Sequence, residues 1–330
     1  MRIAVFSTYT YDEVYLSRFN TGHELTFFVV PLNEQTAALT QGYDAICIFV
    51  NDTVNKSVLE ILYANGVRLV VLRCAGFNNV DVAAAATLGI PVLRVPAYSP
   101  EAVAEHAMAL ILTLNRKTHK AYNRVREGNF SLEKLMGFNL HQRKVAVIGT
   151  GNIGKAFCNI LRGFGCQISA FDIHPDEELA RAGVVYGSLE ETLADADIVS
   201  LHCPLLDSTH HMINAETLKG FKKGAMLINT SRGGLINTMD VISALKNGQL
   251  GYLGLDVYEQ ESKLFFQDYS EDVIQDEMIL RLISFPNVLI TSHQGFFTQE
   301  AMEQIATTTF KNVDAFVAKA DLHNQVITTH

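Results

Sequence analysis

The chain has 330 residues, of which 48% are hydrophobic, and it carries a formal net charge of −9. This length suits two domains of ordinary size, each with a buried core. The acidic surplus disfavours nucleic acid and anionic membranes as partners, although a local basic pocket can still bind a small anion. No apolar run reaches the ~20 residues that a membrane-spanning helix needs. Five scattered cysteines favour a reducing compartment, so we expect a cytoplasmic protein.

Short apolar, β-branched runs alternate with helical patterns in the first third of the chain. These runs lack polar alternation, which is typical of strands buried on both faces. Their alternation with crossover segments predicts a parallel sheet with helices on both sides. The expected strands are Arg2–Ser7, Glu24–Val30, Ala45–Val50, Leu69–Cys74 and Pro91–Val95.

One long helix is expected next, from Ser99 to about Glu127. Ser99 can cap it, Pro100 suits its first turn, and Gly128 ends it. A helix of this length with an apolar face can bridge domains or pack against a second subunit.

A second series of strands and helices follows and predicts a second α/β unit. The fold class is therefore α/β, with two doubly wound, Rossmann-like parallel-sheet domains. A last helix is expected over Gln299–Lys319. The expected strands of this series are Lys144–Ile148, Gln167–Phe171, Ile198–His202, Met226–Thr230, Leu253–Val257 and Val288–Thr291.

A glycine-rich turn between a buried strand and a helical pattern predicts a dinucleotide site. Gly149 permits the tight turn, Gly151 lets backbone N–H groups approach a pyrophosphate, and Gly154 lets helix and strand pack closely. The helix start at Asn152 and Ile153 supplies further donors and a positive dipole. The same motif also occurs in methyltransferases and flavoproteins, so it does not identify the reaction alone.

Asp172 ends the next expected strand, 172 − 154 = 18 residues after the last glycine. In dinucleotide-binding folds, a carboxylate about 20 residues after the glycine motif binds the adenine ribose hydroxyls and repels a 2′-phosphate. We therefore expect NAD rather than NADP. The alternative is that Asp172 is only a surface residue at a strand end.

Three residues near the ends of later strands suit the reduction of a 2-oxo acid. The planar guanidinium of Arg232 can bind a carboxylate through two hydrogen bonds, and His293 is a candidate proton donor. Glu261 can orient that histidine, with Glu259 as a rival. Each residue has a plainer interpretation, namely a surface ion pair, a structural histidine or a solvated acid. We see no cluster with metal-ligand spacing and expect no catalytic metal.

The motifs together resemble the D-isomer-specific 2-hydroxyacid dehydrogenases, and among them the fermentative D-lactate dehydrogenases. The resemblance covers essentially the whole chain. Some members of the family carry asparagine where this chain has Cys74, and tyrosine where it has Phe49 or Phe297. The matching segments, besides the glycine turn, are Arg73–Asp81, Val95–Pro100, Leu201–Pro204, Asn229–Gly233, Asp256–Glu261 and Ser292–Gln294.

The resemblance implies the catalytic set Arg232, Glu261 and His293, and thereby selects Glu261 over Glu259. It implies reversible hydride transfer between NADH and pyruvate, giving D-lactate. It also implies a substrate domain of residues 1–98 and 296–330, an NAD-binding domain of residues 99–295, and a homodimer or homotetramer. The substrate carboxylate would contact Ala75 and Gly76, with Tyr98 nearby, and the NAD cleft would be lined by Cys203, Pro204, Thr230 and Asp256.

The sequence leaves two alternatives open. The chain could perform the same chemistry on a bulkier or different 2-oxo acid, in a pocket shaped by Phe49, Tyr98, Phe296 and Phe297. It could instead be an NADH-sensing binding protein of the corepressor type, which the family also includes.

Overall fold

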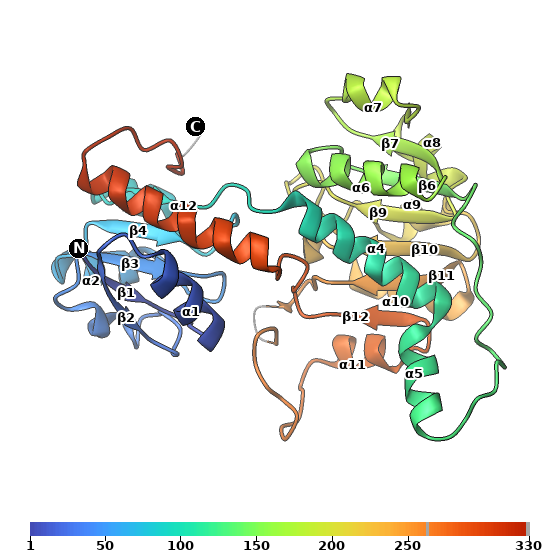
Figure 1. Cartoon of the computed structure of the whole chain (residues 1–330), viewed down its shortest axis with the longest axis horizontal. Helices are drawn as coiled ribbons and strands as arrows, with labels where there is room; N and C mark the ends of the chain where they lie inside the picture. The colour runs from blue at the N-terminus through green and yellow to red at the C-terminus, as the bar shows by residue number, and fades with distance from the viewer. Residues whose placement is uncertain (262–263, 328–330) are drawn as a thin grey trace. The chain divides into compact units, whose positions relative to one another are not determined.

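The structure is a computed structural model that describes residues 1–261 and 264–327, and it divides into two compact units (Figure 1). Unit 1 comprises Met1–Ser99 and Phe297–His330, and unit 2 comprises Pro100–Phe296. Each unit is built on its own parallel β-sheet with helices against it. This confirms the predicted α/β class with two doubly wound domains. Among the described residues, no helix is long and apolar enough to cross a membrane.

Unit 1 contains a five-stranded sheet in the order β2-β1-β3-β4-β5. Its strands are β1 Arg2–Val5, β2 Glu24–Phe27, β3 Ala45–Ile48, β4 Leu69–Leu72 and β5 Val92–Leu93. Its helices are α1 Thr10–Phe19, the 3-10 helix η1 Ala37–Thr40, α2 Lys56–Ala64, α3 Val82–Thr87 and α12 Gln299–Val317.

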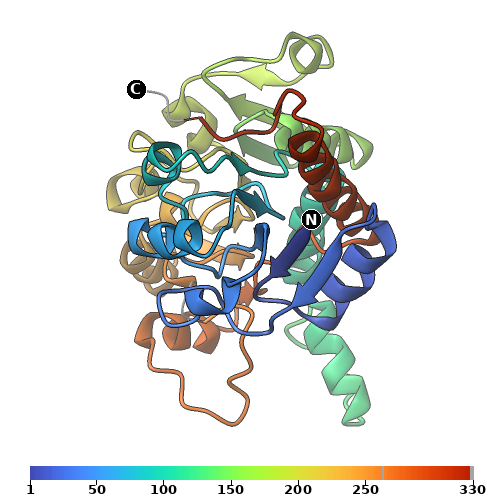
Figure 2. The same cartoon turned by 90° about the vertical axis from the view of Figure 1, so that its left-hand side faces the viewer.

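The helix α12 belongs to unit 1 although about two hundred residues separate it from the rest of that unit. It lies beside α1 on one face of the sheet (Figure 2). Phe310 and Val313 of α12 are buried in one core cluster with Val5 and Val71 of the strands. Unit 1 is therefore completed by the last segment of the chain.

Unit 2 contains a seven-stranded sheet in the order β12-β11-β10-β9-β6-β7-β8. Its strands are β6 Lys144–Ile148, β7 Gln167–Phe171, β8 Val185–Tyr186, β9 Ile198–Leu201, β10 Ala225–Asn229, β11 Leu250–Leu255 and β12 Val288–Ile290. Its helices are α4 Pro100–Arg116, α5 Thr118–Arg126, α6 Asn152–Gly163, α7 Glu177–Arg181, α8 Leu189–Ala194, α9 Ala215–Lys219, the 3-10 helix η2 Gly233–Leu235, α10 Thr238–Asn247 and α11 Glu277–Ser284.

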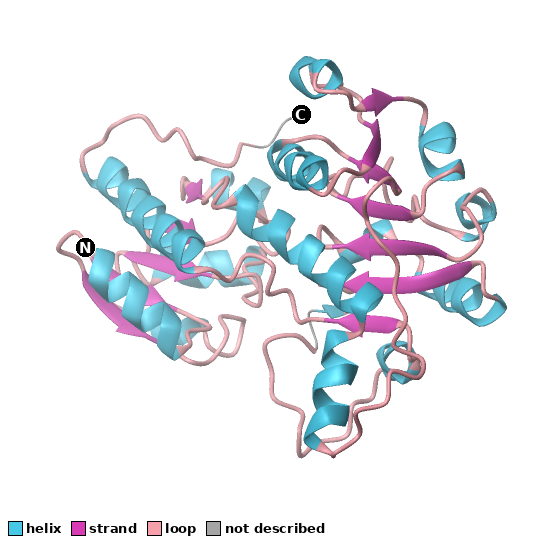
Figure 3. Ribbon diagram, turned by 45° about the vertical axis from the view of Figure 1, so that its right-hand side comes forward, coloured by secondary structure: helices cyan, strands magenta, loops and turns pink. Residues whose placement is uncertain are grey.

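Both faces of the unit 2 sheet are buried. Val145 and Val147 of β6 pack in one core cluster with α4 and α6, which Figure 3 shows on one side of the strands. The alternate residues Ala146 and Ile148 pack in the opposite cluster, with side chains of α8, α9, α10 and α11. Successive strand side chains point to opposite faces, so a strand covered on both sides needs an unbroken apolar run.

The expected single helix from Ser99 to Glu127 is wrong, because the chain forms two helices there. Lys117 separates α4 from α5 and adopts a left-handed conformation, with φ of 51°. That conformation interrupts the hydrogen-bond ladder and turns the chain. The short edge strand β8 was also not predicted, since two residues carry too little periodicity.

A buried ion pair joins three segments of unit 1. The guanidinium of Arg73, directly after β4, is almost fully buried and donates to Asp12 Oδ1 of α1 at 3.1 Å. It also donates to the carbonyls of Phe6 and Ser7 after β1, at 3.0 and 2.7 Å. The pair therefore fixes the start of the loop that follows β4.

Asp12→Ala should destabilise unit 1 strongly, because it leaves the Arg73 charge buried without its counter-ion. We expect a loss of about 3 kcal/mol in the free energy of unfolding, measured by equilibrium urea unfolding. The control is Glu177→Ala, which removes the exposed pair with Arg181 and should hardly move the urea midpoint. Equal, small shifts for both variants would contradict the assignment of Arg73–Asp12 as a structural pair.

Candidate functional site

The glycine turn between β6 and α6 is packed too tightly for side chains at two of its three glycines. Gly149 has φ of 94°, and a Cβ there would lie 2.6 Å from the backbone nitrogen of Cys203. A Cβ on Gly154 would lie 2.0 Å from the Gly149 carbonyl oxygen. At Gly151 a Cβ would meet open space, and α6 begins at the next residue, Asn152. The first N–H groups of α6, those of Asn152 and Ile153 included, are therefore presented at the turn, as phosphate binding requires.

Asp172 directly follows β7 and forms hydrogen bonds with Thr150 of the glycine turn. Its Oδ2 accepts hydrogen bonds from the backbone nitrogen and the hydroxyl of Thr150, at 2.6 and 3.1 Å. Its Oδ1 accepts from the His174 nitrogen at 2.8 Å. Partial burial opposes ionisation, but the hydrogen bonds from His174 and Thr150 hold the pKa of Asp172 below its usual value. A charged carboxylate therefore lies beside the glycine turn.

Two buried polar atoms at the ends of β9 and β10 have no hydrogen-bond partner among the described residues. They are the Thr230 hydroxyl and the Nδ1 atom of His202. A buried polar group without a partner is costly, and a polar ligand can relieve that cost. Cys203 and Pro204 follow His202, and the Cys203 carbonyl accepts from Ser231. The two buried atoms without partners, the glycine turn and Asp172 together form a site that suits a dinucleotide.

Burial of the His202 ring lowers its pKa to about 3, so the ring is neutral at physiological pH. Its other nitrogen, Nε2, lies 2.9 Å from the Ser200 hydroxyl. His202 is therefore part of the wall of this site and a poor candidate for an acid or base.

Asp256 directly follows β11 and differs from the other expected cofactor residues. It is 1% exposed, and its carboxylate accepts hydrogen bonds from the loop Thr291–Gly295. The expected contact between this side chain and a cofactor stays a prediction.

Arg232 lies in the loop after β10, between β10 and the 3-10 helix η2. Its guanidinium is half-buried and donates to the neighbouring Ser231 carbonyl at 2.7 Å. Within the described part of the chain, no acidic side chain forms an ion pair with it. A surface ion pair is therefore not seen for Arg232, and the guanidinium can receive the carboxylate of a small molecule.

His293 and Glu261 are brought together by the structure although 32 residues separate them. The His293 Nδ1 atom lies 2.9 Å from Glu261 Oε1. Both side chains are partly buried, at 20% and 26% exposure. The other Glu261 oxygen accepts from the Tyr258 nitrogen at 2.9 Å, which fixes the carboxylate. The pair has the geometry of an imidazole oriented by an acid.

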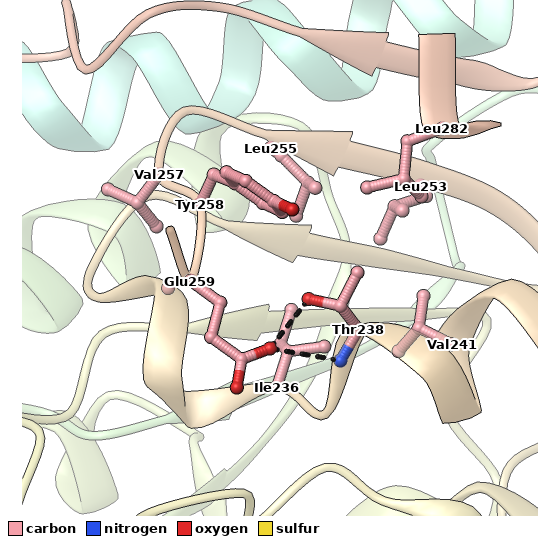
Figure 4. Close-up of a pocket in the computed structure, with 10 residues that line it drawn as sticks. Ile236, Thr238, Val241, Leu253, Leu255, Val257, Tyr258, Glu259 and Leu282 are labelled. Atoms are coloured by element: carbon pink, nitrogen blue, oxygen red, sulfur yellow. Dashed lines mark hydrogen bonds between the residues drawn. The ribbon is translucent and has the colours of Figure 1, made fainter. Parts of the chain in front are cut away.

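Glu259, the rival acid, has other partners. Its carboxylate accepts from the nitrogen and hydroxyl of Thr238 at the start of α10, at 3.3 and 2.8 Å (Figure 4). The His211 Nε2 atom lies 2.6 Å from its other oxygen. Glu259 therefore joins loops within unit 2, while Glu261 is the acid beside His293.

The loop that carries Arg232 packs closely against the backbone of Tyr258 and Glu259. A Cβ on Gly233 would lie 2.1 Å from the Tyr258 carbonyl carbon, so only glycine fits there. The loops after β10 and β11 are thus in direct contact, because β10 and β11 are neighbours in the sheet.

The expected substrate residues Ala75, Gly76 and Tyr98 lie in unit 1. Ala75 and Gly76 follow β4 in the loop that Arg73 anchors, and the Ala75 carbonyl accepts from Arg94 at 2.8 Å. Tyr98 lies just before the boundary of unit 1. Their roles stay predictions.

Two polar residues of unit 2 were missed by the sequence analysis. His106 of α4 and Thr291 after β12 both bind Asp256. A signal was present, because His106 interrupts the apolar face that Val103, Ala107 and Leu110 form at helical spacing.

The chain is similar to known proteins over nearly all of its length. Residues 108–295 match the family model for the NAD-binding domain of D-isomer specific 2-hydroxyacid dehydrogenases. The chain is 52% identical to 2-hydroxyacid dehydrogenase A of Aspergillus oryzae, over 99% of this chain and 95% of the relative.

Solved structures are similar over the full length. The apo-structure of D-lactate dehydrogenase from Escherichia coli has a TM-score of 0.92 and 45% identity, covering 99% of this chain and 100% of that one. A structure described as the pyruvate reductase of Chlamydomonas reinhardtii has a TM-score of 0.93 and 45% identity, covering 98% of each chain. The chain therefore belongs to the D-isomer specific 2-hydroxyacid dehydrogenase family and is an NAD-binding oxidoreductase.

Proposed function

We propose that this enzyme reduces pyruvate to D-lactate with NADH, and catalyses the reverse reaction. The observation that carries the proposal is the His293–Glu261 pair in the same unit as an arginine without an acidic partner among the described residues. The similar proteins named D-lactate dehydrogenase and pyruvate reductase support pyruvate as the substrate.

Arg232 would bind the substrate carboxylate and polarise the ketone oxygen through its planar fork of N–H groups. An ionised Glu261 only accepts hydrogen bonds, so the His293 Nδ1 atom carries a hydrogen toward it. That leaves Nε2 as the atom of His293 that gives a proton to the ketone oxygen during reduction. In the reverse reaction, neutral Nε2 takes the proton from the hydroxyl.

NAD, when bound, supplies or accepts the hydride. The turn at Gly149, Gly151 and Gly154 would bind its pyrophosphate, and Asp172 would bind the adenine ribose. A charged carboxylate at that point repels a 2′-phosphate, so we propose NAD rather than NADP. We further propose unit 2 as the cofactor domain and unit 1 as the substrate domain, with Ala75, Gly76 and Tyr98 as its substrate contacts.

We also propose that the enzyme is a homo-oligomer, at least a dimer, whose contact includes α5 and the segment after it. Phe130, Leu132 and Met136 there are 75%, 83% and 88% exposed. Large apolar side chains gathered on one surface segment are typical of a protein contact. The break at Lys117 sets α5 apart from α4, so this surface is presented by a separate element.

The proposed reaction is tested by NADH oxidation with pyruvate, followed by chiral analysis of the product. We expect D-lactate, and a higher kcat/KM for pyruvate than for phenylpyruvate, 2-oxoisocaproate, glyoxylate or hydroxypyruvate. A preference for one of these acids would replace pyruvate as the substrate and keep the chemistry. NADH binding without turnover on any of them would favour the sensor alternative.

His293→Gln should lower kcat by about 10²- to 10⁴-fold, the usual contribution of a positioned acid–base group. NADH binding, followed by fluorescence titration, should change little, because the substitution lies outside the glycine turn. The matched control is the exposed His141→Gln in the same unit, with kcat near that of the parent protein. Retention of full turnover in the His293 variant would show that another residue transfers the proton.

Replacing both Leu132 and Met136 by Glu should shift the enzyme toward monomer in light scattering coupled to size-exclusion chromatography. Two buried charges in an apolar contact oppose association. Val273→Glu, an exposed apolar residue elsewhere in unit 2, is the control and should leave the mass unchanged. A parent protein that is already monomeric would overturn this proposal without affecting the proposed reaction.

A further inference from the structure

The loop that carries His293 is built around one buried side chain. The carboxylate of Asp256 accepts from the Thr291 hydroxyl at 2.6 Å and from the backbone nitrogens of Gln294 and Gly295 at 2.9 and 2.8 Å. The Asp256 carbonyl accepts from the His293 nitrogen at 2.7 Å. Residues on both sides of His293 are therefore bound to the same aspartate.

His293 needs this support because its backbone is in the left-handed region, with φ of 54°. Residues with a Cβ rarely adopt that conformation, and it persists only where the surroundings hold it. The loop is also closely packed, since a Cβ on Gly295 would lie 2.9 Å from Asp256 Oδ2 and 3.4 Å from the His106 ring. The direction of the His293 imidazole toward Glu261 depends on this backbone.

His106 completes the network from α4. Its Nε2 atom lies 3.0 Å from the Thr291 hydroxyl and 3.2 Å from Asp256 Oδ1. The Thr291 hydroxyl donates to Asp256, so it can accept from His106, and Nε2 is the donor. The His106 side chain is 16% exposed, and the Asp256 side chain 2%. His106 thus supplies the link between this cluster and a helix that spans the sheet face.

The charge of the Asp256 carboxylate also favours these hydrogen bonds. Burial of Asp256 opposes its ionisation, but hydrogen bonds from His106, Thr291 and the Gln294 nitrogen hold its pKa below the usual value. An ionised carboxylate accepts from several donors at once, which a protonated one does less well. The bonds that hold the loop are therefore charge-assisted.

We propose that His106 is a positioning residue of the reaction: through Asp256 and Thr291 it holds the backbone of His293 in the conformation that aims the imidazole at Glu261. His106 itself touches neither Glu261 nor His293 in the hydrogen bonds of the described residues. The inference rests on the proposed role of His293 as the proton donor.

The test compares His106→Ala, which removes the donor, with His106→Gln, whose amide N–H replaces Nε2. A displacement near 1 Å at a reacting group can cost on the order of 10²-fold, so we expect that loss of kcat for His106→Ala. His106→Gln should restore most of it. The NADH dissociation constant should stay near that of His141→Ala, the matched surface control, and both variants should remain folded at the assay temperature.

The double variant His106→Ala with His293→Gln separates a positioning role from general damage. If His106 acts through His293, the double variant is no slower than His293→Gln alone, because residues that act as a unit are not additive. A further loss in the double variant would overturn the proposal. So would full activity of His106→Ala, or a loss that His106→Gln does not restore.

A readout without turnover keeps this proposal separate from the proposed function. The Nδ1 proton shared by His293 and Glu261 should give a downfield imidazole resonance in protein with ¹⁵N-labelled histidine, assigned by its loss in His293→Gln. We expect it to be lost or shifted in His106→Ala and restored in His106→Gln. An unchanged resonance would refute the positioning role, whereas full turnover of His293→Gln would refute only the proton donor.

Discussion

The central strands of unit 2 are covered by helices on both faces, so their side chains are enclosed in two apolar cores. A ligand cannot reach them there, and polar chemistry is confined to the loops at the strand ends. Because all seven strands are parallel, the loops after β6, β7, β9, β10, β11 and β12 emerge at one edge of the sheet. Gly149, Asp172, Thr230, Glu261 and His293 all lie at that edge.

Close packing then decides how those loops meet. The turn at Gly149 contacts the backbone of Cys203, and Gly233 contacts the backbone of Tyr258. Side chains are excluded at these points, and the loops support one another through backbone contacts. The same principle acts around Asp256, where one buried carboxylate holds the residues on either side of His293. The left-handed backbone of His293 is tolerated because these hydrogen bonds hold it in place.

The two glutamates of the segment Asp256–Glu261 are close in sequence but bind different partners. Glu259 binds Thr238 and His211, and so holds the start of α10 against nearby loops. Glu261, two residues later, lies against His293. Both are acids in the same loop, and their spacing did not distinguish them. The distinction arises from which loops happen to lie on each side of the segment.

By itself the sequence determined the α/β class, the positions of most strands along the chain, the glycine turn, and the place of Asp172 directly after the next strand. These follow from local patterns, because an apolar run or a glycine spacing acts within one strand–turn–helix segment. Resemblance to a known family, carried by ordered motifs, identified Glu261 over Glu259. The tertiary structure alone decided the break at Lys117, the joining of α12 to unit 1, and the network of His106, Thr291 and Asp256. Those features depend on contacts between residues up to 293 positions apart, and local periodicity carries no information about such contacts.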